Sequence, residues 1–491
     1  MKRTFVCFLL LVLSFSPACA QTYLSDPIYA RLTLPFFCIS EIPRDMDLIE
    51  EALNRMTRAK IGAEVRLVPL LALSDGAPDA RREAELYMLE REGVSFDLFC
   101  DALPDFESLA IPLDDLLRDY GKDILEVLDA ERLDAYRQDG VLFSLPSVSD
   151  YVISQGIAMR KDIVETYDLD LSGIHSIEDL DALFATVHAC EPEIGVVCGS
   201  NTTEAVLRYT ADAMLLPETV FCLSDTEEHT LTNYYATGVF AELVSRTRSW
   251  HDAGYIAHGA SLQNTDAASL VRAGELFSFI TSCEPGTEQE LSRSCGMEMT
   301  VIPLQDGVVS AQSSTMRQWG ITRNCANPGK AMQFLNLLYT DSEVVNLLLY
   351  GIEGIHYVER EDGTIGYPEG VTSLDVGFAN NMPWILPNQY IARVWEGQPL
   401  DLWEQLKTFN ETAEVTELVG FVFDDAEVAA ENAELRAIVD ECSFGLTTGR
   451  LDPEIYLPLM LSEMEDAGLE VVLAEAQEQY DRWRIAKEEG T

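Results

Sequence analysis

The residue types that carry most enzyme chemistry form no catalytic pattern in this chain. Of six histidines, the nearest pair in sequence, His251 and His258, flanks a glycine in the manner of helix-end or surface residues. Adjacent acids such as Asp114 and Asp115 arise by chance among 83 acidic residues, so they do not indicate a glycosidase. The H-E-x-x-H, G-x-S-x-G and S-x-x-K signatures of hydrolases are absent. We therefore predict that the chain is not an enzyme.

The cysteines do not form a metal-binding pattern either. There are eleven of them, none in a C-x-x-C pair, and their spacing matches no zinc or iron–sulfur site. The chain also lacks the G-x-x-x-x-G-K-[ST] loop that cradles nucleotide phosphates. We expect no metal site, no cofactor and no nucleotide hydrolysis by this chain.

The charge balance excludes some partners. With 83 acidic against 33 basic residues, the net charge is −50 and the pI is about 4.2. Such a surface repels nucleic-acid phosphates and anionic lipid head groups. The hydrophobic fraction of 47% and the mean hydropathy of +0.02 are typical of a well-buried globular protein. At 491 residues, the chain is long enough for two to four domains.

The pattern of the first twenty residues predicts an export signal. A basic pair precedes the apolar run Phe5–Phe15, and small residues follow at positions 18–20. This is the pattern of a secretory signal peptide over residues 1–20. Two outcomes stay open, because cleavage after Ala20 would release a soluble protein, whereas lipidation of Cys19 would anchor it. No other stretch has the ~20 unbroken apolar residues of a membrane-spanning helix.

Downstream of the signal, strand and helix patterns alternate. The expected order is strand Thr33–Cys38, helix Leu48–Met56 capped by Asp45 or Asp47, strand Ile61–Leu71, helix Arg81–Arg91 and strand Val94–Cys100. This alternation predicts an α/β sheet, whose ligands bind beyond the carboxyl ends of the strands. A helix capped by Ser342, a hairpin turning at Asp362-Gly363 and a helical last third are also expected.

Several segments carry a family resemblance through their order. They are Leu145-Pro146 leading to Met159-Arg160-Lys161-Asp162, Gly274–Phe279, Val301–Leu304, Trp319–Leu335, Leu337–Tyr357, Tyr367-Pro368-Glu369-Gly370, and Gln479 with Trp483. The set resembles the family 1 extracellular solute-binding proteins, the class that includes maltose-binding protein. The later segments are similar to a subgroup with an extra helical C-terminal domain of unassigned function. The resemblance extends over nearly all of the chain after the signal.

The resemblance implies a periplasmic-binding-protein-like clamp of type II, with two lobes that are each a mainly parallel sheet flanked by helices. The expected divisions are 21–146 plus 298–342 for lobe one, 147–297 plus 343–400 for lobe two, and 401–491 for a helical extension packed on the clamp. The implied function is that of the extracytoplasmic solute-binding component of an ABC-type importer. This component closes on a carbohydrate, and separate permease subunits recognise its closed form. A monomer is expected.

Other functions stay open beside this one. The same clamp could bind peptides or amino-acid-like solutes, serve sensing or adhesion without transport, or belong to an exported hydrolase. Sugar-binding clamps stack aromatic rings on sugar faces and bind hydroxyls with carboxylates and amides. By position, the candidate ligand-binding residues are Phe37, Asp101, Asp150, Tyr151, Glu284, Trp319, Trp384 and Asn388.

Overall fold

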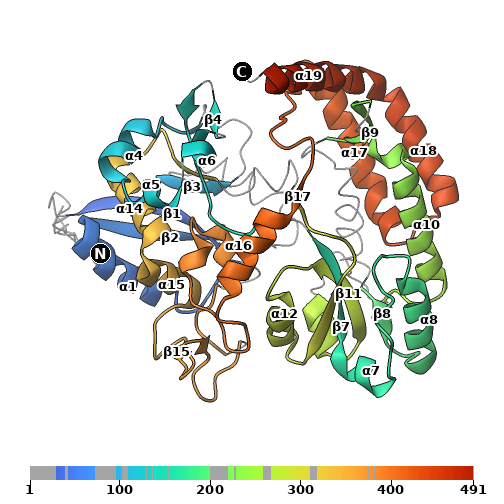
Figure 1. The fold of residues 1–491 in the computed structure, drawn as a ribbon, viewed down its shortest axis with the longest axis horizontal. Helices are drawn as coiled ribbons and strands as arrows, with labels where there is room; N and C mark the ends of the chain where they lie inside the picture. The colour runs from blue at the N-terminus through green and yellow to red at the C-terminus, as the bar shows by residue number, and fades with distance from the viewer. Residues whose placement is uncertain are drawn as a thin grey trace, which may run out of the picture.

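Two large hydrophobic cores divide the chain into two lobes that lie side by side (Figure 1). The computed structural model describes residues 29–38, 42–71, 96–101, 109–128, 130–134, 136–138, 140–152, 154–198, 219–225, 228–257, 267–309, 318–373, 375–380 and 382–489. The predicted signal peptide with Cys19, and the helix expected at Arg81–Arg91, lie outside these residues. Among the described helices, none combines the length and the apolar character that crossing a membrane requires.

The first lobe contains most of the N-terminal third and a later return of the chain. Its first part comprises β1 (Ala30–Cys38), α1 (Met46–Ile61), β2 (Ala63–Leu71), β3 (Leu98–Asp101), α4 (Asp114–Tyr120), α5 (Ile124–Val127), α6 (Ala130–Asp134), β4 (Arg137–Gln138), β5 (Val141–Leu142) and β6 (Leu145–Pro146). The returning part comprises β14 (Gln318–Ile321), α14 (Pro328–Thr340), α15 (Ser342–Tyr350), β15 (Val358–Glu359), β16 (Ile365–Gly366), η3 (Pro383–Ile385), η4 (Gln389–Ile391) and α16 (Leu402–Thr412).

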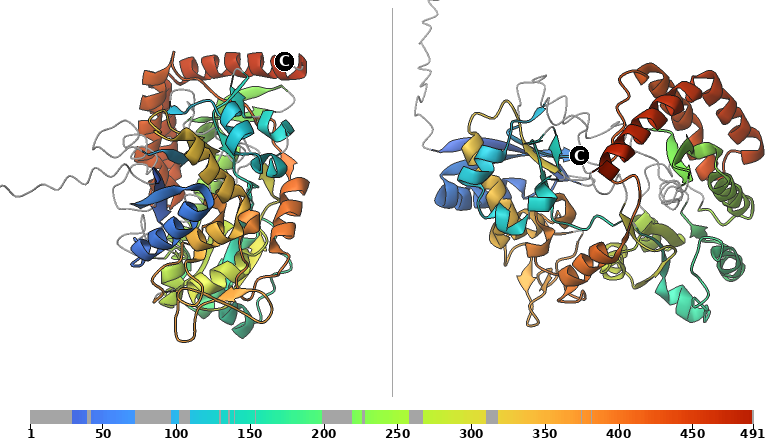
Figure 2. Two further views of the ribbon diagram at one scale, coloured as in Figure 1. Left: turned by 90° about the vertical axis from the view of Figure 1, so that its left-hand side faces the viewer. Right: turned by 45° about the horizontal axis from the view of Figure 1, so that its top comes forward.

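The second lobe holds the middle of the chain. Its elements are β7 (Gln155–Arg160), α7 (Lys161–Thr166), α8 (Leu180–Cys190), β8 (Gly195–Val197), β9 (Phe221–Asp225), β10 (Thr230–Asn233), η2 (Tyr234–Ala236), α10 (Gly238–Asp252), α11 (Ala267–Arg272), β11 (Leu276–Ser282), α12 (Thr287–Cys295) and β12 (Met299–Pro303). The C-terminal helices α17 (Ala429–Thr447), α18 (Pro453–Asp466) and α19 (Leu469–Glu489) stack on this lobe (Figure 2).

The predicted α/β class is confirmed, but the sheets are mixed and not mainly parallel. In the first lobe β1 pairs with β2 in parallel, whereas β14 is antiparallel to both β3 and β6. In the second lobe the order is β12-β7-β11-β8, and β7 runs antiparallel to both of its neighbours. Strands β7 and β14 each follow a passage from the other lobe. Each of the two strands therefore starts near the connection between the lobes, and it runs antiparallel to neighbouring strands that end there.

The predicted boundaries need correction at three places, the first being residues 401–412, which were assigned to the C-terminal extension but contain α16, whose Trp403 packs against the first-lobe core. Residues 343–400 were assigned to lobe two, but Val344, Tyr350 and Trp395 are buried in the core that contains Leu32 and Leu145. The segment from residue 298 was assigned to lobe one, but Met299–Pro303 form β12 on the second-lobe sheet. Apolar residues at helical spacing can pack equally well on either lobe, so periodicity did not distinguish the two. We propose that 318–412 complete lobe one and that 154–305 form lobe two.

Three passages of the chain join the lobes. They lie between β6 and β7, between β12 and β14, and between α16 and α17. The last two are tied together, because β13 (Val308–Val309) pairs in parallel with β17 (Glu414–Val415). Thr416 extends this ladder by donating its backbone N–H to the carbonyl of Val309 at 2.9 Å. The C-terminal extension therefore begins within the junction itself.

Candidate functional site

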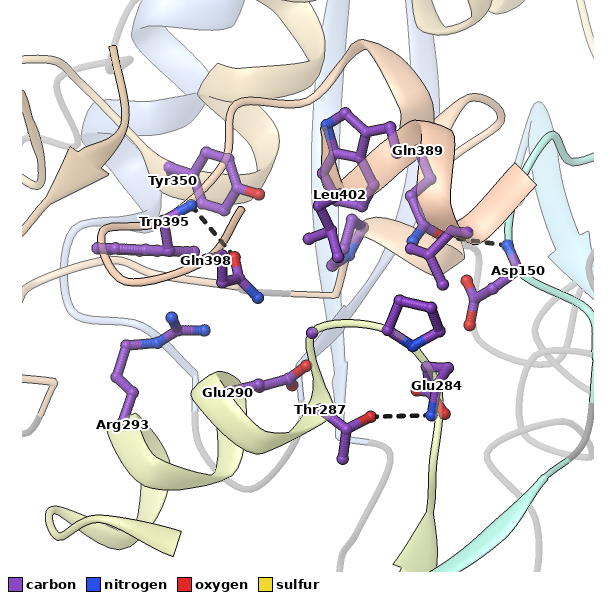
Figure 3. Close-up of a pocket in the computed structure, with 15 residues that line it drawn as sticks. Asp150, Glu284, Thr287, Glu290, Arg293, Tyr350, Gln389, Trp395, Gln398 and Leu402 are labelled. Carbon is purple, nitrogen blue, oxygen red and sulfur yellow. Dashed lines mark hydrogen bonds between the residues drawn. The ribbon is translucent and has the colours of Figure 1, made fainter. Parts of the chain in front are cut away.

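A crevice separates the start of α12 in the second lobe from the returning segment of the first lobe (Figure 3). The second lobe contributes Glu284, Thr287, Glu290 and Arg293 to its wall. The first lobe contributes aromatic and amide side chains, namely Tyr350, Gln389, Trp395, Gln398 and Trp403, and Asp150 lies at the passage between the lobes. The crevice thus combines carboxylates, amides and aromatic rings from both sides.

The second-lobe wall is set by a tight turn after β11. The backbone N–H of Thr287 donates to the carbonyl of Glu284 at 3.1 Å, and the N–H of Glu284 donates to Oγ1 of Thr287 at 3.2 Å. Gly286 has a φ of +92°, in the left-handed region that favours glycine. A Cβ at Gly286 would lie 2.8 Å from Cδ1 of Leu402, so a side chain there would collide with α16. The turn lets the second lobe approach the first closely.

The passage that carries Asp150 is anchored to the first lobe. The backbone N–H of Asp150 donates to Oε1 of Gln389 at 3.4 Å, and the backbone N–H of Gln389 donates to the carbonyl of Val148 at 2.9 Å. The buried amide of Asn410 accepts from the N–H of Tyr151 at 3.3 Å and donates to the carbonyl of Ser149 at 3.0 Å. These bonds fix the backbone of this passage against α16 and the η4 segment.

The electrostatics of the crevice are dominated by carboxylates in a poorly solvated space. Burial raises the pKa of the Glu290 carboxyl above its ordinary value; Arg293 opposes this shift, and the charge of Asp150 adds to it. Burial likewise raises the pKa of the Tyr350 hydroxyl, against the opposing effect of Arg293. The guanidinium of Arg293 lies 4.9 Å from the centre of the buried Trp395 ring, which is a cation–π arrangement between the lobes.

This combination of groups can bind a polyhydroxylated solute. Carboxylates and amides hold hydroxyl groups by hydrogen bonds, and partly buried rings such as Trp403 offer apolar contact to a sugar face. Among the described residues, no group of three or more His, Cys, Asp and Glu side chains is placed to hold a metal ion.

Two of the sequence-predicted residues, Asp150 and Glu284, line the crevice. Tyr151 follows Asp150 and packs its ring under the guanidinium of Arg132, 6.0 Å from the ring centre. Asn388 is buried and serves the fold, since its Nδ2 donates to the carbonyl of Tyr339 at 2.8 Å and its Oδ1 accepts from the N–H of Tyr390 at 3.1 Å.

The remaining candidates do not line this crevice. Trp319 is 3% exposed within the first-lobe core on β14, and Phe37 is half-buried on β1. The backbone of Asp101 pairs with Gln318, and Trp384 lies in η3 next to Pro383, which does line the crevice. The side chains of Asp101 and Trp384 lie outside the described part of the structure. The ligand-binding roles of all eight candidates stay predictions.

Sequence reasoning missed Glu290, Arg293, Trp395, Gln398 and Trp403, which form much of the crevice wall. The signal for Glu290 was available, because it follows Gly286 within the first turn of a helix after a strand end. For Trp395 and Trp403 the available signal was the presence of two more tryptophans shortly after Trp384. Their position beside α12 depends on how the two lobes pack, which the sequence pattern did not indicate.

Comparisons with known proteins agree with this architecture. Residues 417–485 match a family model described as a domain of unknown function (DUF3502). A protein named carbohydrate ABC transporter substrate-binding protein, from Streptococcus pneumoniae serotype 4 (strain ATCC BAA-334 / TIGR4), is 23% identical over 465 residues, covering 92% of this chain and 90% of that protein.

Solved structures show the same fold at low identity. The N-glycan transport solute binding protein NgtS from Streptococcus pneumoniae superimposes with a TM-score of 0.78 at 20% identity, covering 93% of this chain and all of that one. Its complex with Man1GlcNAc gives a TM-score of 0.74 at 20% identity, covering 92% and 99%. The predicted resemblance is confirmed: the chain has the fold of the extracellular solute-binding proteins, in the form that carries the additional helical C-terminal domain.

Proposed function

We propose that this chain is the extracytoplasmic solute-binding component of an ABC-type importer and that its ligand is an oligosaccharide. The observation that carries the proposal is the crevice between the lobes, where Asp150 and Glu284 stand with the amides of Gln389 and Gln398 and the ring of Trp403. These are the groups that bind sugar hydroxyls and sugar faces. The sugar named in the NgtS complex supports the same class of ligand for this chain.

The clamp works by a change in the populations of its open and closed forms. A ligand that touches both walls of the crevice binds the closed form more tightly, and it shifts the equilibrium by that difference in affinity. The residues that face each other across the crevice, Glu290 and Arg293 on α12 against Trp395 and Gln398, belong to different lobes. Closure would therefore assemble the site, and separate permease subunits would recognise the closed form.

The remaining parts of the proposal concern chemistry and location. The chain binds its solute without altering it, acts outside the cytoplasmic membrane, either soluble or held by a lipid on Cys19, and works as a monomer. Support comes from the export signal in residues 1–20 and from the transport role in the name of the pneumococcal relative.

The test is a thermal-unfolding panel on the protein without residues 1–20, with neutral oligosaccharides, monosaccharides, amino acids and short peptides. A ligand at about 100 times its dissociation constant adds about 2.7 kcal/mol to the free energy of unfolding. We expect a stabilising oligosaccharide that is recovered unchanged, and a smaller stabilisation in Asp150→Asn but not in Glu434→Gln on the exposed face of α17. Stabilisation by peptides alone, or consumption of the sugar, would contradict the proposal.

A further inference from the structure

The first passage between the lobes changes its partners within a few residues. At Tyr151 its backbone is still bonded to the first lobe, because the N–H of Tyr151 donates to Oδ1 of Asn410 on α16 at 3.3 Å. At Ser154 it is bonded to the second lobe, because the carbonyl of Ser154 accepts from the N–H of Cys283, directly after β11, at 3.1 Å. The passage therefore leaves one lobe and joins the other around Val152.

The second passage has its own pair of attachments. The N–H of Leu304 donates to the carbonyl of Gln155 in β7 at 2.8 Å, which holds this end of the passage on the second-lobe sheet. The chain then enters β13, which pairs with β17 directly after the first-lobe helix α16, and Figure 1 shows β17 between the two lobes. Asp306 and Gly307 lie between these two attachments.

The two passages are in close contact at this place. A Cβ atom at Gly307 would lie 2.5 Å from Cγ1 of the buried Val152 and 2.8 Å from Cζ of Phe409 on α16. Carbon atoms that are not bonded to each other pack at about 3.5–4.0 Å, so a side chain at position 307 would force the passages apart. Glycine at this position lets both passages and the last helix of the first lobe meet.

Such a contact is what a rotation between the lobes requires. When two lobes turn relative to each other, a few residues at the points of connection absorb the change in backbone angles. If these points lay far apart, a turn at one passage would stretch or compress the other. Points that touch can share one axis.

We infer that Gly307 and Val152 form the pivot about which the clamp turns, and that the absence of a side chain at Gly307 sets the angle between the lobes. The inference rests on the proposed clamp function and goes beyond it by naming the residues at which the lobes turn. Gly307 acts as a positioning residue, because it controls how the two walls of the crevice face each other.

The experiment measures the angle between the lobes as a distance, without any ligand. In the protein without residues 1–20, spin labels are attached to the exposed Cys190 at the end of α8 and to Glu51→Cys on α1, where the side chain of Glu51 is exposed. Burial raises the pKa of the half-buried Cys283 and Cys442 thiols, which therefore react slowly at pH 7. Double electron–electron resonance gives the distance between the labels.

We expect Gly307→Ala to shift the mean distance by at least about 2 Å, because the added methyl group pushes the passages apart. Adding Val152→Ala should return the distance to that of the parent, since it removes both γ-methyl groups and leaves only the half-buried ring of Phe409 to move aside. Val152→Ala alone loosens the contact and should broaden the distribution of distances, which keeps the inference testable if Gly307→Ala does not fold.

Gly320→Ala is the matched control. Its Cβ would lie 2.5 Å from Cζ of Phe99, a contact between β14 and β3 within the first lobe. It should lower the thermal stability and leave the distance between the lobes unchanged. An unchanged distance in folded Gly307→Ala, a shift that Val152→Ala does not reverse, or an equal shift in Gly320→Ala would overturn the inference. Failure of every sugar to stabilise the protein would contradict the proposed ligand and leave this result standing.

Discussion

Arg293 and Trp395 join the two lobes across the mouth of the crevice. The guanidinium belongs to α12 of the second lobe, the indole belongs to the first-lobe core, and 4.9 Å separates the guanidinium carbon from the ring centre. A cation on a buried indole face is the strongest form of this interaction. The pair therefore stabilises the arrangement in which the crevice walls face each other.

Replacing Arg293 by Met keeps much of the apolar length of the side chain and removes its charge. We expect ligand affinity to fall by about fivefold, because the cation–π contact contributes about 1 kcal/mol. The matched control is Arg450→Met, which removes a similar contact with Phe444 at 5.3 Å inside the C-terminal domain. Calorimetric titration of both variants separates the two sites, and equal losses of affinity would refute a local role for Arg293.

Gly286→Ala tests how closely the lobes approach. The substitution places a Cβ 2.8 Å from Leu402 at a φ of +92°, so we expect it to lower both stability and ligand affinity, the stability by about 1–3 kcal/mol. Gly370→Ala is the control, because Gly370 has a φ of +78° and no atom within 4 Å of its added Cβ. Chemical unfolding and titration should show the backbone cost in both variants and the loss of affinity in Gly286→Ala alone.

The raised pKa of Glu290 gives the pH dependence of stability a defined sign. The folded state holds this proton more tightly than the unfolded state, whose carboxyl has its ordinary value of about 4.3. The contribution of Glu290 to stability is therefore complete below that value and is lost as the pH rises through the folded pKa. Glu290→Gln should flatten the curve in this window and be more stable than the unmodified protein at pH 7. Urea unfolding between pH 4 and 7 measures both effects, and parallel curves would disprove the shift.

Asn410→Ala tests the anchoring of the first passage between the lobes. The buried amide bonds to Tyr151, Ser149 and Tyr390, so its loss leaves buried polar groups without partners and should cost about 1–3 kcal/mol. Ligand affinity should fall as well, because Asp150 loses its support. Asn336→Ala removes comparable bonds to residues 123–124 on the surface, so it should lower stability and leave affinity intact.

Much of the local structure was predictable because local chemistry determined it. The hairpin at Asp362-Gly363 forms with Gly363 at a φ of +89°. The helix start near Ser342 was found within one residue, although Asp341 is the side chain that accepts from the N–H groups of Glu343 and Val344. Short-range rules of capping and turn formation were sufficient for these elements.

Predictions from the sequence were less successful where contacts between residues distant in the sequence determine the position of a side chain. Asp45 or Asp47 was expected to cap α1; Asp45 occupies the N-cap position, but its carboxylate makes no capping bond and instead contacts Nε2 of the buried His356 at 3.1 Å. In the crevice, Asp150 and Glu284 were predicted from their positions in the sequence. Asp150 lies in the first passage between the lobes, and Glu284 follows the end of β11. Arg293 and Trp395 were missed because two segments about 100 residues apart meet only when both lobes are folded.

The shared core of the second lobe and the C-terminal domain sets an order of events during synthesis. Ile157 and Phe184 pack in the same core as Val472, Ala476 and Tyr480. The second lobe therefore cannot complete its core until these residues of α19 have been synthesised. Contacts this distant in sequence close slowly, because a long loop must be ordered before they form. On our proposal that residues 1–20 act as an export signal, the chain would reach its translocation machinery before the core of its second lobe could be completed.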